Sequence, residues 1–125
     1  MEYQSPYFER RSKPWGYERI CTPSSLPYAG KVLHIATGCR LSLQQHDTKL
    51  ETLMLLSGRA ILWIGQSADA LERVEMQLDQ GYTVNIMQVH RIESLDDCEI
   101  MEVSTPEAGI TFRLQDDYAR VDEKR

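Results

Sequence analysis

The stretch that decides the fold is SLQQHDTKLETLMLLSG, residues 42–58, together with the two residues before it. Polar and apolar side chains alternate through residues 40–46, which predicts a β-strand. The leucines of this strand, Leu41 and Leu43, are expected on one face. Its polar face is expected to carry Arg40, Ser42, Gln44 and His46. Such a face either meets water or lines a pocket, and the remainder of the chain decides between the two.

The rest of the sequence is built from short β-like segments. Turn residues separate them about every 8–12 positions, which is typical of an all-β sandwich or barrel. Residues 68–74 also contain helix-favouring side chains, but the alternation of Val74, Met76 and Leu78 favours a turn or helical corner followed by a strand. The predicted strands are Tyr17–Cys21, Lys31–Ala36, Arg40–Gln45, Glu51–Leu56, Ala60–Gly65, Leu71–Leu78, Tyr82–Met87, Arg91–Glu93, Cys98–Ser104 and Ile110–Leu114.

The length of 125 residues predicts a single domain over residues 1–125. Residues 1–30 contain four of the five prolines and are expected to form an irregular N-terminal arm with one short strand. Residues 31–114 are expected to form the barrel core. Residues 115–125 are expected to form a C-terminal closing segment.

Composition excludes several classes of function. The net charge is −5 and the basic residues do not cluster, so we expect no nucleic-acid partner. No apolar run is long enough to span a bilayer, and the first residues lack a signal-peptide pattern, so we expect no membrane association. Cys21, Cys39 and Cys98 are scattered, without a C-x-x-C pair. This usage favours a reducing compartment, and we expect the protein to be cytoplasmic.

Four side chains with metal-ligand chemistry follow one another as Gln44, His46, Glu51 and, further along the chain, His90. Residues two apart on a strand share a face, and a carboxylate just across the following turn can converge with them on one ion. Imidazole nitrogens and a carboxylate suit Zn²⁺ and its first-row neighbours. A neutral Gln44 would leave the bound ion electrophilic. An exposed polar sheet face is the alternative that this spacing leaves open.

Five segments, in this order, resemble the small single-domain mannose-6-phosphate isomerase-like cupins, which are akin to the cupin part of type II phosphomannose isomerases. They are KPWGYE (13–18), RLSLQQHDTKLETLMLLSG (40–58), HRIES (90–94), EVSTPE (102–107) and LQDDYAR (114–120). The resemblance implies an all-β cupin double-stranded β-helix, a small barrel or jelly roll of two antiparallel sheets with a metal in its mouth. It also implies one divalent ion, zinc first, with manganese, iron or nickel as alternatives. The implied ligands are Gln44, His46, Glu51 and His90.

The same resemblance implies an enzyme, a sugar-phosphate isomerase or epimerase of the aldose–ketose type, that acts as a homodimer on a sugar phosphate or a related small polar metabolite. At positions matching the family motifs, Lys49 and Arg91 are candidate catalytic residues. Candidate substrate-binding residues are Arg40, Ser42 and Gln88. The alternatives are a non-haem metal oxygenase, because two histidines and one carboxylate suit Fe²⁺, and a non-catalytic sugar- or metabolite-binding cupin.

The second motif departs from the family pattern. A Pro-x-Gly turn usually precedes its histidine, whereas residues 85–90 read NIMQVH and are two residues shorter. A loss of two residues preserves strand alternation, so His90 can still face inward. The turn that positions His90 must nevertheless differ.

Overall fold

The structure is a computed structural model and describes residues 5–106, 108–118, 120 and 123–124. These residues form two antiparallel six-stranded sheets and contain no helix, so none of them belongs to a helix that could cross a membrane. The first sheet has the order β1 (Glu9–Lys13), β2 (Gly16–Ile20), β3 (Ala29–Ile35), β10 (Cys98–Ser104), β5 (Glu51–Ser57) and β8 (Gly81–Val84). The second has the order β12 (Glu123–Lys124), β11 (Ile110–Gln115), β4 (Leu43–His46), β9 (Val89–Ser94), β6 (Ala60–Gly65) and β7 (Leu71–Glu75).

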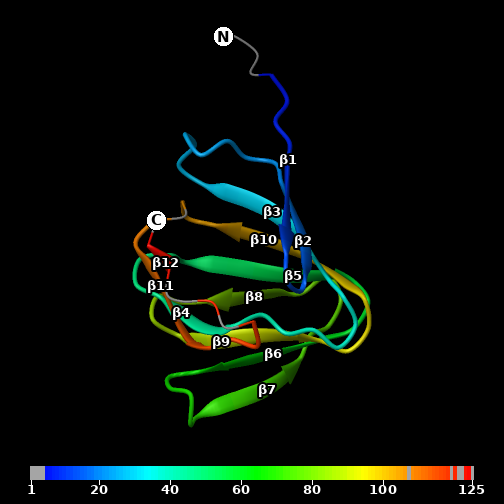
Figure 1. Cartoon of the computed structure of the whole chain (residues 1–125), viewed down its shortest axis with the longest axis vertical. Helices are drawn as coiled ribbons and strands as arrows, with labels where there is room; N and C mark the ends of the chain where they lie inside the picture. The colour runs from blue at the N-terminus through cyan, green and yellow to red at the C-terminus, as the bar shows by residue number, and fades with distance from the viewer. Residues whose placement is uncertain (1–4, 107, 119, 121–122, 125) are drawn as a thin grey trace.

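The two sheets lie against each other as the layers of a jelly roll (Figure 1). The predicted all-β architecture of two antiparallel sheets is therefore confirmed. Of the expected closing segment, residues 119, 121, 122 and 125 lie outside the described residues.

The inner face of the first sheet changes character along its strands. At one end it is apolar, and its side chains are at most 2% exposed; these include Leu33, Ile35, Leu53, Leu55, Cys98 and Ile100. Burial of each such side chain stabilises the fold by about 1.5–3 kcal/mol. At the other end the same strands present Lys31, Glu102 and Glu51, and the register places Glu102 directly opposite Lys31. The apolar core therefore lies at one end of the barrel, and charged side chains line the other end.

The N-terminal arm is more regular than expected. Residues Glu9–Lys13, which are charged enough to be taken for a solvated run, form β1 and pair in register with β2. Strand β3 begins at Ala29 rather than Lys31. Trp15, in the turn between β1 and β2, is 4% exposed and packs into the core. Pairing with a neighbouring strand therefore overrides the polar local sequence.

Two predicted strands are too long. The strand expected over Leu71–Leu78 ends at Glu75, and a turn precedes it, as one of the two predicted forms of this corner. The strand expected over Tyr82–Met87 ends at Val84. A tight turn follows, in which Met87 has a φ of 66° and its backbone N–H donates to the His46 carbonyl oxygen over 2.8 Å. This turn replaces the missing Pro-x-Gly turn and ties the approach to β9 onto β4.

The predicted face is wrong for Arg40 and Leu41, because the pairing against β9 shifts by one residue, whereas Ser42 lines the inner cavity with Gln44 and His46 as predicted. Gln44 lies opposite His90, whereas Arg40 lies opposite Glu93. A shift of one residue reverses which face a side chain occupies. Arg40 therefore lies on the outer face of the sheet with Leu43, and Leu41 lies inside.

Candidate metal centre

Three buried side chains with metal-ligand chemistry converge between the sheets. His46 ends β4, Glu51 begins β5, and His90 lies in β9. One potential ligand atom from each lies within 4.8 Å of the others. The Nε2 atom of His90 is 3.0 Å from Oε1 of Glu51, and the two imidazole ring centroids are 5.3 Å apart. The fold therefore brings His90 next to His46 and Glu51, although it is distant from them in sequence.

The elements that carry the cluster fix its geometry. Gln44 and His90 are directly opposite each other on neighbouring antiparallel strands, so their side chains share a face. The turn after His46 is held by Asp47, whose Oδ1 accepts a hydrogen bond of 2.8 Å from the Ile110 backbone N–H. That turn brings Glu51 back to the same end of the barrel.

Hydrogen bonds also orient the imidazole rings. His90 Nδ1 lies 3.1 Å from the Gln88 carbonyl oxygen. A carbonyl oxygen only accepts, so Nδ1 carries the proton and donates, and Nε2 faces Glu51. His46 Nδ1 lies 2.9 Å from the Thr111 hydroxyl, which leaves Nε2 for the cluster. Such partners on the second nitrogen are characteristic of metal-binding histidines.

The donor set fits a divalent first-row metal ion. With the proton on Nδ1, a neutral His90 directs its Nε2 lone pair at the Glu51 carboxylate, which is repulsive unless a cation or a second proton lies between them. Two ligands bound at about 2.1 Å are about 3.0 Å apart at a right angle and about 3.4 Å apart at the tetrahedral angle. The 3.0 Å between His90 and Glu51 lies at the short end of that range. Two imidazoles and one carboxylate suit zinc, and also manganese, iron or nickel.

Gln44 lies beside the cluster and lines the same cavity as His46 and Glu51. Its amide oxygen accepts a hydrogen bond of 3.2 Å from the hydroxyl of Ser42, which is 2% exposed. Ser42 therefore contacts the Gln44 amide directly. An amide oxygen retains a second lone pair that can face a metal ion.

Lys49 is buried between two carboxylates. Its Nζ lies 3.1 Å from Glu51 Oε2 and 2.9 Å from Glu102 Oε2. Burial alone would lower the pKa of Lys49, but Glu102 and Glu51 outweigh it and raise this pKa above its ordinary value. Burial would likewise raise the pKa of Glu51, but the Lys49 ammonium outweighs it and holds this pKa well below its usual range. Lys49 is therefore a charged hydrogen-bond donor in this site, and Glu51 is an ionised acceptor.

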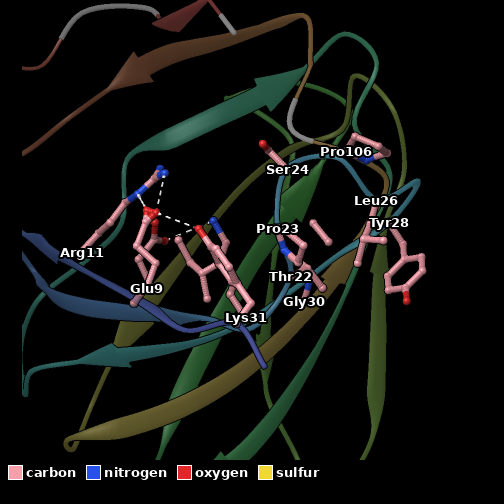
Figure 2. A pocket seen from close by; sticks show the side chains of 14 residues that line it. Glu9, Arg11, Thr22, Pro23, Ser24, Leu26, Tyr28, Gly30, Lys31 and Pro106 are labelled. Atoms are coloured by element: carbon pink, nitrogen blue, oxygen red, sulfur yellow. Dashed lines mark hydrogen bonds and ion pairs between the residues drawn. The ribbon is translucent and has the colours of Figure 1, made fainter. Parts of the chain in front are cut away.

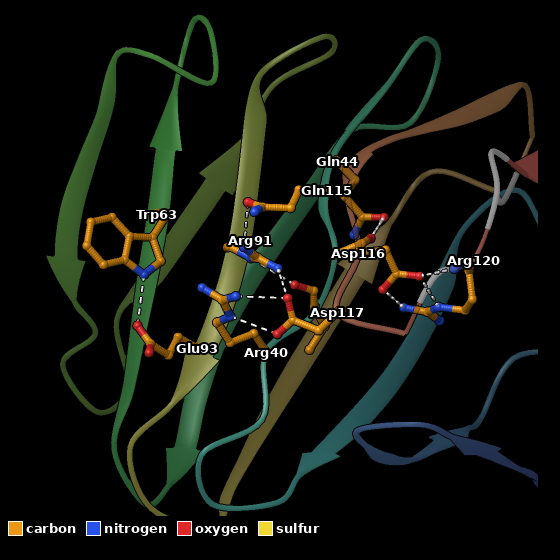
Figure 3. A network of polar contacts seen from close by, with 11 residues as sticks. Arg40, Gln44, Trp63, Arg91, Glu93, Gln115, Asp116, Asp117 and Arg120 are labelled. Atoms are coloured by element: carbon orange, nitrogen blue, oxygen red, sulfur yellow. Dashed lines mark hydrogen bonds and ion pairs between the residues drawn. The ribbon is translucent and has the colours of Figure 1, made fainter.

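The structure places Arg40 and Arg91 away from this cluster, on the outer face of the second sheet (Figure 3). Arg91 is 4% exposed and donates to the Leu41 carbonyl oxygen over 3.0 Å and to the Gln115 amide oxygen over 3.2 Å. Both arginines also bond to Asp117. Neither is among the described residues that line the cavity at His46.

Gln88 also has a local role in the structure. Its side-chain oxygen accepts from the Asn85 backbone N–H over 2.8 Å, and its backbone oxygen orients His90. It therefore stabilises the turn before β9. In the C-terminal segment, Arg120 forms an ion pair with Asp116, with 3.0 Å between its Nε and Asp116 Oδ2.

Sequence reasoning missed several charged residues of the cavity. Glu102 is 6% exposed and follows Cys98 and Ile100 on the inner face of β10, so a carboxylate in phase with buried apolar residues was a readable signal. The remaining charged residues that were missed are Lys13, Glu18, Lys31, Arg113 and Arg120. Thr111, which orients His46, carries no such signal because its partner is distant in sequence.

The cavity over the cluster has a volume of about 60 Å³ and positive character. Five cationic side chains and three carboxylates line it; these are Lys13, Lys31, Lys49, Arg113 and Arg120, with Glu18, Glu51 and Glu102. A divalent ion adds two further positive charges. The site therefore favours a small anionic group next to the metal position.

No protein-family model and no curated protein matches this sequence. Solved structures do resemble it. Oxalate decarboxylase from Lactobacillus farciminis, in a formate complex, gives a TM-score of 0.73 at 20% identity over 91% of this chain and 37% of its own. KdgF from Halomonas sp. gives 0.66 at 12% identity over 79% and 88%. CapF from Staphylococcus aureus gives 0.65 at 15% identity over 96% and 33%.

These likenesses establish the fold. The chain shares the jelly-roll fold of these structures, as its sequence predicts, and spans about a third of the length of the CapF and oxalate decarboxylase chains. The mannose-6-phosphate isomerase-like subtype stays a prediction.

Proposed function

We propose that this chain is a metal-dependent cupin enzyme that holds one divalent ion, zinc first, through Gln44, His46, Glu51 and His90. The observation that carries the proposal is the convergence of three buried donor groups within 4.8 Å of one another. When bound, the ion supplies a Lewis acid that polarises a carbonyl or hydroxyl oxygen of the substrate.

The reaction class we assign first is aldose–ketose isomerisation or epimerisation of a sugar phosphate or a related anionic sugar. Such a reaction needs a group that accepts a proton from carbon and a positive charge that stabilises the resulting enediolate. Lys49 supplies the charge, because its raised pKa keeps it protonated. Glu102 is the candidate proton acceptor, since it lines the cavity, is buried and is not part of the ligand cluster.

The experiment that tests this assignment is interconversion of mannose 6-phosphate and fructose 6-phosphate by zinc-loaded protein. The proposal expects turnover that disappears with a chelator and falls by about 10²–10⁴-fold in Glu102→Gln, the range for loss of an acid–base group. The matched control is Glu99→Gln, which changes a carboxylate on the same strand but on the outer face. Inactivity of folded, zinc-loaded protein on these sugars would overturn the isomerase assignment while leaving the metal site in place.

A metal-dependent oxygenase is the second candidate. It is favoured by the composition of the cluster, two histidines and one carboxylate, which is the ligand set of non-haem Fe²⁺ oxygenases. Oxygen consumption by the Fe²⁺-loaded protein distinguishes the oxygenase from the isomerase.

Homodimer formation and a cytoplasmic location stay predictions from the sequence.

A further inference from the structure

A second cavity lies beside the metal cavity, between the hairpin of β1 and β2, the start of β3, and the loop before it (Figure 2). Its volume is about 280 Å³. This volume is close to the lower end of drug-sized ligand sites, about 300 Å³, and a single ring-sized group needs less space than a drug-sized ligand. Figure 2 shows Glu9 and Arg11 on one side, Lys31 between, and Pro23, Leu26 and Tyr28 on the other.

The two cavities share two walls, the side chains of Glu18 and Lys31. These form an ion pair of 3.1 Å, and Lys31 Nζ also lies 3.6 Å from Glu102 Oε2. The strand register explains the continuity, because Arg11 lies opposite Glu18 and Lys31 opposite Glu102, so all four side chains occupy the inner face of one sheet. A single surface therefore runs from the metal position into the second cavity.

The metal cavity is smaller than the second cavity, with a volume of about 60 Å³ against about 280 Å³. A substrate whose reacting end lies at the metal position can extend past Glu18 and Lys31 into the larger cavity.

The two cavities differ in the charge of the side chains that line them. Cations outnumber carboxylates around the metal position, so an anionic group is favoured there. In the second cavity the charges balance, since Glu9 pairs with Arg11 over 2.9 Å and Glu18 pairs with Lys31. Paired donors and acceptors match hydroxyl groups better than a net charge does. The exposed ring of Tyr28 offers an apolar face to sugar C–H groups.

We propose that the second cavity is the distal half of the substrate site and binds an uncharged sugar ring. This inference rests on the proposed metal-dependent function. The substrate class that it assigns is an anionic sugar joined to at least one further, neutral sugar unit, with the anionic sugar in the metal cavity and the neutral ring against Tyr7 and Tyr28.

Two probes test the proposal with zinc-loaded protein. Gluconate is a sugar acid, and lactobionate is the same acid carrying one neutral galactose ring. By calorimetric titration we expect zinc-dependent binding of both, with lactobionate at least about tenfold tighter, equivalent to about 1.4 kcal/mol. Amide NMR shifts within residues 22–31 should respond to lactobionate alone. Equal affinities, or failure of both acids to bind the zinc-loaded protein, would overturn the inference.

A double variant and a control variant test whether the second cavity binds the neutral ring. Tyr7→Ala combined with Tyr28→Ala removes both aromatic walls and should reduce lactobionate to the affinity of gluconate. Phe8→Ala is the matched control, because Phe8 is 67% exposed, neighbours Tyr7 and is not among the described residues lining the cavity. A lactobionate advantage that survives the double substitution contradicts the inference alone. Gluconate binding that is the same with and without zinc contradicts the proposed function instead.

Discussion

At the scale of single residues, the site depends on the buried charge of Lys49. Its ammonium group contacts Glu51 and Glu102, and each of the three is at most 6% exposed. Buried carboxylates without a cationic partner are costly, because desolvation is no longer offset by attraction. Lys49 therefore stabilises the fold and keeps Glu51 ionised for a metal.

Replacement of Lys49 by Met should destabilise the protein by about 3–5 kcal/mol, since it removes the ammonium group that two buried carboxylates share and leaves Glu102 with only the 3.6 Å ion pair to Lys31. Urea denaturation of the metal-free protein measures this. The double variant Lys49→Met/Glu102→Gln should recover part of the loss. Arg59→Met is the control, because Arg59 forms an exposed ion pair with Glu75 and should cost at most about 1 kcal/mol. Equal losses in Lys49→Met and Arg59→Met would contradict this account.

The convergence of the candidate ligands could be predicted from the sequence, whereas the face on which Arg40 lies could not. Gln44, His46 and Glu51 lie close in sequence, so alternation and one turn suffice to predict that they converge. The outer-face position of Arg40 depends on a one-residue shift against β9, which only the partner strand determines. Local pattern carries no information about that shift.

At the scale of elements, the turns between strands set where the ligands lie. Gly58, between β5 and β6, has a φ of 82°, and a Cβ there would collide with the Asp97 carbonyl oxygen. Gly38 has a similar φ of 79°, but a Cβ there would meet nothing within 4 Å. Substitutions at the two glycines therefore distinguish the cost of the left-handed backbone conformation from the cost of a steric collision.

Gly38→Ala should therefore cost about 1–2 kcal/mol, the penalty for an L-residue in the left-handed region. Gly58→Ala should cost more, because the backbone near Asp97 must also move. Thermal or urea unfolding of the two variants measures the difference. Equal losses for the two substitutions would show that the collision at Gly58 is relieved without cost.

The ion pairs that join β1, β2 and β3 predict a pH dependence. Burial would raise the pKa of Glu18, but Lys31 and Lys13 outweigh it, so this pKa lies below the ordinary value. A carboxyl group with a lowered folded-state pKa contributes stability above its unfolded pKa, about 4.3, and loses that contribution as pH falls through the folded value.

The stability advantage of wild type over Glu18→Gln should accordingly be largest at neutral pH and should shrink below about pH 4.3. Urea denaturation of both proteins from pH 7 to pH 3 measures it. A difference that does not change with pH would contradict an ionised Glu18 in the folded protein.

At the scale of the whole molecule, the barrel keeps an apolar core at one end and concentrates charge at the other. The general architecture was predictable, because alternating short strands and turns define two-layer β folds. The strand β1 and the second cavity were not, since both arise from pairing among β1, β2 and β3 rather than from local sequence.

Metal binding should stabilise the folded chain, because its donors come from three separate strands and converge only on folding. At a free Zn²⁺ concentration 100 times the Kd, the gain should be about 2.7 kcal/mol. Thermal unfolding with and without zinc measures it. His90→Ala should remove most of the increment, whereas His34→Ala should retain it, because His34 lies on the outer face against Tyr17.

The central claim is that His46, Glu51 and His90, with Gln44, hold one divalent metal ion. Anomalous diffraction at the zinc edge, from crystals of the zinc-loaded protein, tests it most directly. The account predicts a single strong peak inside the barrel, at about 2.0–2.2 Å from the His46 and His90 Nε2 atoms and a Glu51 carboxylate oxygen. An empty cluster in zinc-loaded crystals, or a peak bound only by other residues, would contradict it.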